Sequence, residues 1–146
     1  MSMWLNLMQL TAPSFEKIRK DKEKLEALFV DNAGPEDFDA EDDTYGTDYL
    51  MIDEMLRASN ELTEDDELGD NAEVKTDPLY RCTVGDGPLE HETGYGQAFY
   101  LSAASVQALA KELKDQYAGA GGDFDELCDF TKRAATRGCV IVGGIE

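Results

Sequence analysis

The sequence predicts an α+β protein in which a small sheet packs against about four helices. Three apolar stretches predict the strands: an N-terminal one at Met3–Leu10, a central one at about 97–101 and a C-terminal one at about 139–143. Short runs that are apolar on both alternating faces are typical of strands covered on both sides. Elsewhere, apolar residues recur at intervals of three and four, which predicts helices with one buried side.

The clearest unit runs from Gly94 to Tyr117 and contains a turn, a strand, a cap and a helix. Gly94 and Gly96 permit the backbone angles of a tight turn. Ser102 follows the strand and has the side chain of a helix N-cap. The helix after it has one apolar side, formed by Val106, Leu109, Ala110, Leu113 and Tyr117.

An N-terminal helix is predicted after the first strand. Thr11 can act as its N-cap and Pro13 falls in its first turn, where a missing N–H does no harm. An apolar stripe starts at Phe15 and continues to Phe29. The exposed side holds the main basic concentration of the chain, which we interpret as a solvated helix face: Lys17, Arg19, Lys20, Lys22 and Lys24.

Two more helices complete the prediction. Apolar residues from Tyr45 to Leu56 share one helical side. Asp123 and Glu126 have the spacing of a capping box, and Gly138 is suited to end the helix that follows. Tyr80–Val84, which lies between two turns, is predicted as a short edge segment.

Length and composition indicate one domain spanning residues 1–146. A chain of this size buries roughly two thirds of the surface that its unfolded form exposes. No apolar run approaches the length of a membrane span, and Met1–Leu10 lacks the features of a signal peptide, so we expect a cytoplasmic protein. The odd cysteine count (Cys82, Cys128 and Cys139) predicts reduced thiols in or near the core.

Acidic residues are concentrated in the middle of the chain. The net charge is -19, from 13 basic and 32 acidic side chains. Between Asp31 and Asp77 there are 18 acidic residues and two basic ones, Arg57 and Lys75. We expect two acidic loops there, at about 31–44 and 60–77. Such a charge repels nucleic acid and anionic membranes and attracts cationic surfaces.

Motifs for catalysis or cofactor binding are weak. His91 is the single histidine, which excludes a two-histidine metal site, and we expect it to be exposed in a Gly-rich, acidic turn. The acids from Asp37 to Asp48 partly match a calcium loop, but its sixth position is Asp42 where a glycine is needed. Gly94–Gly96 lacks the rest of a dinucleotide fingerprint. We therefore predict no metal, no cofactor and no catalytic residue.

Several stretches together resemble the YfbM-like bacterial proteins, a family defined as a domain of unknown function. The similarity is carried by Met1–Met3 with Asn6, Asp48–Leu50, Asp77–Leu79, Gly94–Val106 and Phe130–Val142. It implies an α+β domain and no established activity. The segment Thr44–Asp48 departs from the family pattern, which tends to have Trp and His there.

Two function classes remain open, together with a third alternative in which the acidic loops have no function. The first is a non-enzymatic binding protein, of the immunity or antitoxin type, that masks a basic partner protein. Its predicted contact residues are Glu36, Asp37, Asp39, Glu41, Asp42, Asp43, Asp48, Glu64, Asp65, Asp66 and Glu67. The second is a small-molecule-binding protein or enzyme with a cleft near Tyr95 and Tyr100, also using Asp48. The third is an acidic domain whose loops have no function.

Overall fold

A five-stranded antiparallel sheet with the strand order β2-β1-β5-β4-β3 forms the centre of the protein. It is seen in a computed structural model that describes residues 4–31, 40–68, 71–94 and 96–146. The strands are β1 (Trp4–Leu10), β2 (Ala40–Asp48), β3 (Gly87–Thr93), β4 (Gly96–Leu101) and β5 (Val140–Ile145). The α+β class predicted from the sequence is confirmed.

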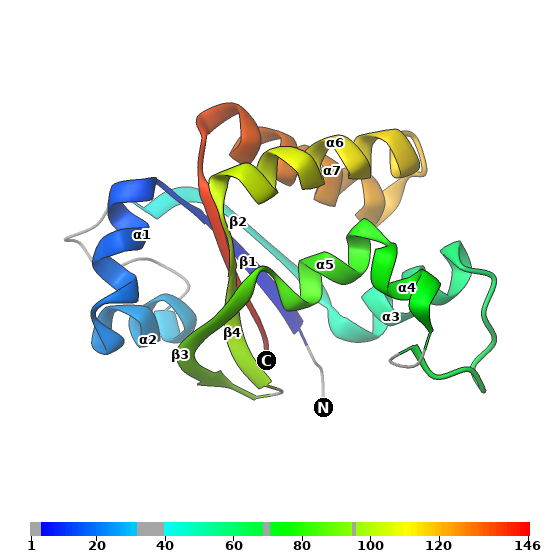
Figure 1. The fold of residues 1–146 in the computed structure, drawn as a ribbon, viewed down its shortest axis with the longest axis horizontal. Coiled ribbons are helices and arrows are strands. Elements are labelled where there is room, and N and C mark those ends of the chain that lie inside the picture. The colour runs from blue at the N-terminus through cyan, green and yellow to red at the C-terminus, as the bar shows by residue number, and fades with distance from the viewer. Residues whose placement is uncertain (1–3, 32–39, 69–70, 95) are drawn as a thin grey trace.

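Helices cover both faces of the sheet (Figure 1). One face packs against α1 (Ala12–Arg19) and α2 (Lys22–Asp31). The other packs against α3 (Tyr49–Ser59), α5 (Pro78–Val84), α6 (Ala103–Tyr117) and α7 (Gly122–Arg137), and the short α4 (Ala72–Thr76) precedes α5. None of these described helices is long and apolar enough to cross a membrane.

The strand β1 shows why the sheet needs two helical layers. Leu5 and Leu7 belong to the core under α3 and α5–α7, whereas Met8 and Leu10 belong to the core under α1 and α2. Successive strand residues point to opposite faces, so a strand that is apolar at both must be covered on both. The prediction of an interior strand here is confirmed.

The three strands expected from the sequence are the adjacent strands β1, β5 and β4 in the middle of the sheet. The two that were missed, β2 and β3, form its edges. Tyr45 lies in β2, so the predicted helix actually begins at Tyr49, and residues 40–44 of the first predicted loop are strand. Residues 32–39 of that loop lie outside the described residues. Likewise, His91 lies in β3 and not in a turn.

The helix predictions need four corrections. The N-terminal helix is divided into α1 and α2, with Lys20 as the C-cap of α1. The edge segment predicted at Tyr80–Val84 is part of α5, and the segment 60–77 contains α4. The start of α7 uses Gly121 without a side-chain cap, not the predicted capping box.

Other local predictions are confirmed. The side chain of Thr11 accepts a hydrogen bond from the backbone N–H of Ser14, and Ser102 accepts one from that of Ser105. Gly138 ends α7 in the left-handed conformation. The cysteines are free; Cys82 and Cys139 are buried and Cys128 is half-buried.

Two adjacent glycines in β5 allow the close packing of both cores. A Cβ atom on Gly143 would lie 2.6 Å from Cζ of Phe99 and 2.7 Å from a methyl carbon of Leu7. On Gly144 it would lie 2.7 Å from the Thr93 methyl carbon and 2.9 Å from the Phe29 ring. Strand and helix side chains therefore occupy the space that any other residue would need.

We predict that Gly143→Ala lowers the free energy of unfolding by about 1 to 3 kcal/mol, because the added methyl overpacks the core. Gly94→Ala is the matched control, since a Cβ there would make ordinary contact with the Glu146 backbone at 3.6 Å. Urea unfolding of both variants measures the difference, and equal stabilities would contradict the packing argument.

Candidate functional site

Exposed carboxylates gather on the segment that joins α3 to α4 and on these two helices. We call this set the acidic surface; its members are Glu54, Glu61, Glu64, Asp65, Asp66, Glu67 and Glu73, all exposed. The segment lies at one end of the long axis of the molecule, and α1 and α2 lie at the other (Figure 1). The lysines of α1 and α2 are therefore too distant to neutralise it.

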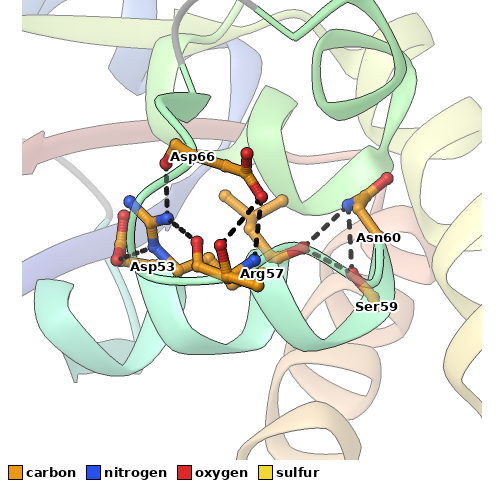
Figure 2. A network of polar contacts seen from close by, with 7 residues as sticks. Asp53, Arg57, Ser59, Asn60 and Asp66 are labelled. Carbon is orange, nitrogen blue, oxygen red and sulfur yellow. Dashed lines mark hydrogen bonds and ion pairs between the residues drawn. The ribbon is translucent and has the colours of Figure 1, made fainter.

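Arg57 holds the acidic segment against α3. Its Nε donates to a carboxylate oxygen of Asp53, one turn earlier, at 2.8 Å. Its Nη1 donates to the backbone carbonyls of Thr63 and Asp66 (Figure 2). Hydrogen bonding to Asp53 raises the pKa of the guanidinium, so it stays charged. One side chain thus links the helix to two points of the following segment.

A second set of contacts shapes the turn inside the segment. The Asp66 carboxylate accepts hydrogen bonds from the backbone N–H of Thr63 at 2.9 Å and from its hydroxyl at 3.2 Å. These bonds satisfy the N–H and hydroxyl groups of Thr63, and side-chain bonds of this kind stabilise turns. Glu64 and Asp65 lie within the turn and are exposed. The turn therefore presents their carboxylates to solvent.

The buried carboxylate of Asp77 anchors the two ends of the acidic segment. It is 7% exposed and accepts hydrogen bonds from Ser59 and Asn60 at the end of α3. It also caps α5 through the N–H of Leu79 and accepts from the Tyr117 hydroxyl at 2.7 and 2.9 Å. Burial, and then the neighbouring carboxylate, raise the pKa of Tyr117, which therefore remains a donor.

The structure brings together part of the predicted contact set. Glu64, Asp65, Asp66 and Glu67 are exposed and adjacent, and Asp48 is half-buried at the end of β2. Three predicted residues lie in β2, where the structure describes the strand but not their side chains: Glu41, Asp42 and Asp43. Three more lie outside the described residues: Glu36, Asp37 and Asp39.

Sequence reasoning missed Arg57 as the organiser of this site, and it missed Glu54, Glu61 and Glu73 as members. The spacing of Asp53 and Arg57, four residues apart, is a signal that could have identified the ion pair. Nothing in the spacing shows that the same guanidinium also reaches the carbonyls of the next turn.

Among the described residues, the histidine, tyrosine and cysteine side chains that could take part in chemistry make packing contacts or are buried. His91 stacks on Phe29 with ring centroids 4.9 Å apart, and Tyr100 packs on Phe15 at 5.5 Å. Burial raises the pKa of Cys82 to about 12, so its thiol is protonated at neutral pH. Tyr95, the other residue of the predicted cleft, lies outside the described residues.

Within residues 4–31, 40–68, 71–94 and 96–146, no three His, Cys, Asp or Glu side chains are placed to hold an ion together.

The fold and surface define an acidic α+β protein with helices on both faces of an antiparallel sheet. The chain belongs to the family described as Domain of unknown function (DUF1877), whose model matches residues 1–120. A crystal structure of YfbM, a protein of unknown function from Escherichia coli, shares the fold with a TM-score of 0.55 and 13% sequence identity, covering 100% of both chains. No curated protein matches the chain. These similarities support the family resemblance noted in the sequence and bring no activity with them.

We predict that Asp77→Ala lowers the free energy of unfolding by at least about 3 kcal/mol, because the buried donors of Leu79 and Tyr117 and the part-buried donors of Ser59 and Asn60 lose their acceptor at once. Tyr117→Phe removes one of those donors and leaves the carboxylate its other partners, so we expect a loss of about 1 kcal/mol. Urea unfolding compares the two variants. A loss for Asp77→Ala no larger than that for Tyr117→Phe would contradict the anchoring role.

For Arg57→Ala we expect faster hydrogen exchange of the backbone amides of residues 60–68, because the link from α3 to this segment is lost. Arg19→Ala is the control, since Arg19 pairs with Glu16 on an exposed face of α1. Hydrogen-deuterium exchange followed by mass spectrometry resolves the segment. Unchanged exchange at 60–68 would show that Arg57 does not order it.

Proposed function

We propose that the protein is a non-enzymatic binding protein that masks a basic partner protein, in the manner of an immunity protein or antitoxin. The observation that carries the proposal is the acidic surface, whose carboxylates are exposed on a segment held in place by Arg57. A prearranged acidic surface binds a basic one with less ordering cost than a disordered tail does.

The charges around this surface support the same proposal. Arg57 lies in α3 next to the segment, but its guanidinium is bound to Asp53 and to backbone carbonyls. Between Arg57 and Asp77 the sequence has one other basic residue, Lys75. The surface therefore keeps nearly all of its negative charge, which attracts a cationic partner and accelerates its association.

An inhibitor needs the surface to be accessible and separate from the core. The anchoring group Asp77 is buried, whereas Glu64, Asp65 and Glu67 are exposed. Asp66 is exposed but also holds the turn, so Glu64, Asp65 and Glu67 are the carboxylates to change. Changing the exposed ones leaves the anchor intact, so binding can be tested without unfolding the protein.

The proposal is tested with a triple variant, Glu64→Gln, Asp65→Asn and Glu67→Gln. The wild-type protein is immobilised, incubated with an extract of its native host and eluted with a salt gradient. We expect a basic host protein to be retained at low salt and released as salt rises, because screening weakens charge attraction. The triple variant should lose at least about tenfold in affinity for it, or about 1.4 kcal/mol.

The matched control removes the same charge elsewhere, through Glu23→Gln, Glu26→Gln and Glu92→Gln. These exposed residues lie on α2 and β3, away from the acidic surface. The control should retain the partner with nearly unchanged affinity. Equal weakening by both triple variants would indicate attraction to net charge alone and would contradict a specific surface.

A further inference from the structure

A second candidate site lies between α6 and α7, independent of the acidic surface. The two helices border a groove of about 680 Å³. That volume is within the range of small-molecule sites, roughly 300 to 1,000 Å³. One wall, α7, lies beyond residue 120, where the match to the family model ends.

Contacts at two points set how the helices face each other. The Gln107 side chain donates to the backbone carbonyl of Ala135, and the Cys128 thiol to that of Leu113 at 3.6 Å. The helices are therefore antiparallel in this region. Lys111 lies between the first and second contacts on α6, and Lys132 lies between them on α7. These two lysines consequently reach the same stretch of the groove from opposite walls.

Three lysines gather at this groove, although the chain as a whole is strongly acidic. Lys111, Lys114 and Lys132 all line the groove and are exposed. None of the ion pairs in the part of the chain that the structure describes involves them. Since the chain has 32 acidic and 13 basic residues, three unpaired lysines at one groove form a local exception to its charge.

Two carboxylates and several small residues complete the groove. Asp125 and Asp129 project from α7 at positions that line it. Between the charged groups lie Ala110, Ala135 and the half-buried Cys128. Burial, and then the two aspartates, raise the pKa of Cys128. The thiol therefore stays protonated and gives the groove a weakly polar surface, and it does not act as a nucleophile.

We infer that this groove binds a small phosphorylated molecule that carries hydroxyl groups. Lysine ammonium groups recognise phosphate as point charges, and Lys111 and Lys132 would hold it from both walls. The carboxylates of Asp125 and Asp129 accept hydrogen bonds from hydroxyl groups. They also disfavour a ligand that is anionic along its whole length.

The inference is tested on the full-length protein by NMR titration of backbone amides with ribose 5-phosphate, inorganic phosphate and ribose. We expect saturable shifts at α6 and α7 with ribose 5-phosphate, weaker binding of inorganic phosphate and none of ribose. The double variant Lys111→Gln and Lys132→Gln should weaken ribose 5-phosphate binding at least about tenfold. Both positions are exposed on helices and Gln is a good helix former, so the fold is kept.

Lys17→Gln with Lys20→Gln is the matched control, because it removes the same charge from α1 and its C-cap. This variant should change the dissociation constant by less than about twofold, which is within the scatter expected for distant surface charges. Equal weakening by both double variants would overturn the inference, since binding would then follow net charge. So would the absence of saturable shifts at α6 and α7 with either phosphate compound.

Discussion

The buried carboxylate of Asp77 is the constraint on which the helical layer around the acidic surface depends. A buried charge is tolerated only when its hydrogen bonds are satisfied, and here the donors come from three places in the chain. Ser59 and Asn60 end α3, Leu79 begins α5 and Tyr117 ends α6. Satisfying one side chain therefore fixes where three helix ends meet, and the acidic segment leaves and re-enters the fold at that junction.

Much of the fold was predictable from the sequence. In the sheet, the central strands could be predicted and the edge strands could not. The central strands β1, β5 and β4 are apolar on both faces, which is a strong signal over a few residues. The edge strands β2 and β3 carry many polar and charged residues, with Gly46 in one and Pro88 in the other. Charged residues and proline are typical of sheet edges, yet in a sequence they are also typical of loops. Whether such a segment is an edge strand or a loop is decided by its pairing with a neighbouring strand, which the sequence does not show.

The candidate sites show the same limit. Composition alone located the acidic stretch and four of its exposed members, Glu64–Glu67. It could not show that Arg57 bridges α3 and the following turn, because that depends on how the chain folds back. Likewise, helical spacing places Lys111 on one side of α6 and Lys132 on one side of α7. Only the packing of the helices shows that these sides adjoin.

The position of β5 in the sheet has a consequence for how the chain acquires its structure during translation. β5 pairs with both β1 and β4, so among the described strands it joins the β1–β2 pair to the β3–β4 pair. It also follows the other four described strands in the chain. Until it emerges from the ribosome, the two strand pairs have no common sheet and their inner edges stay open, a state prone to aggregation. Assembly of the five-stranded sheet therefore waits for β5, although the other strands come earlier in the chain.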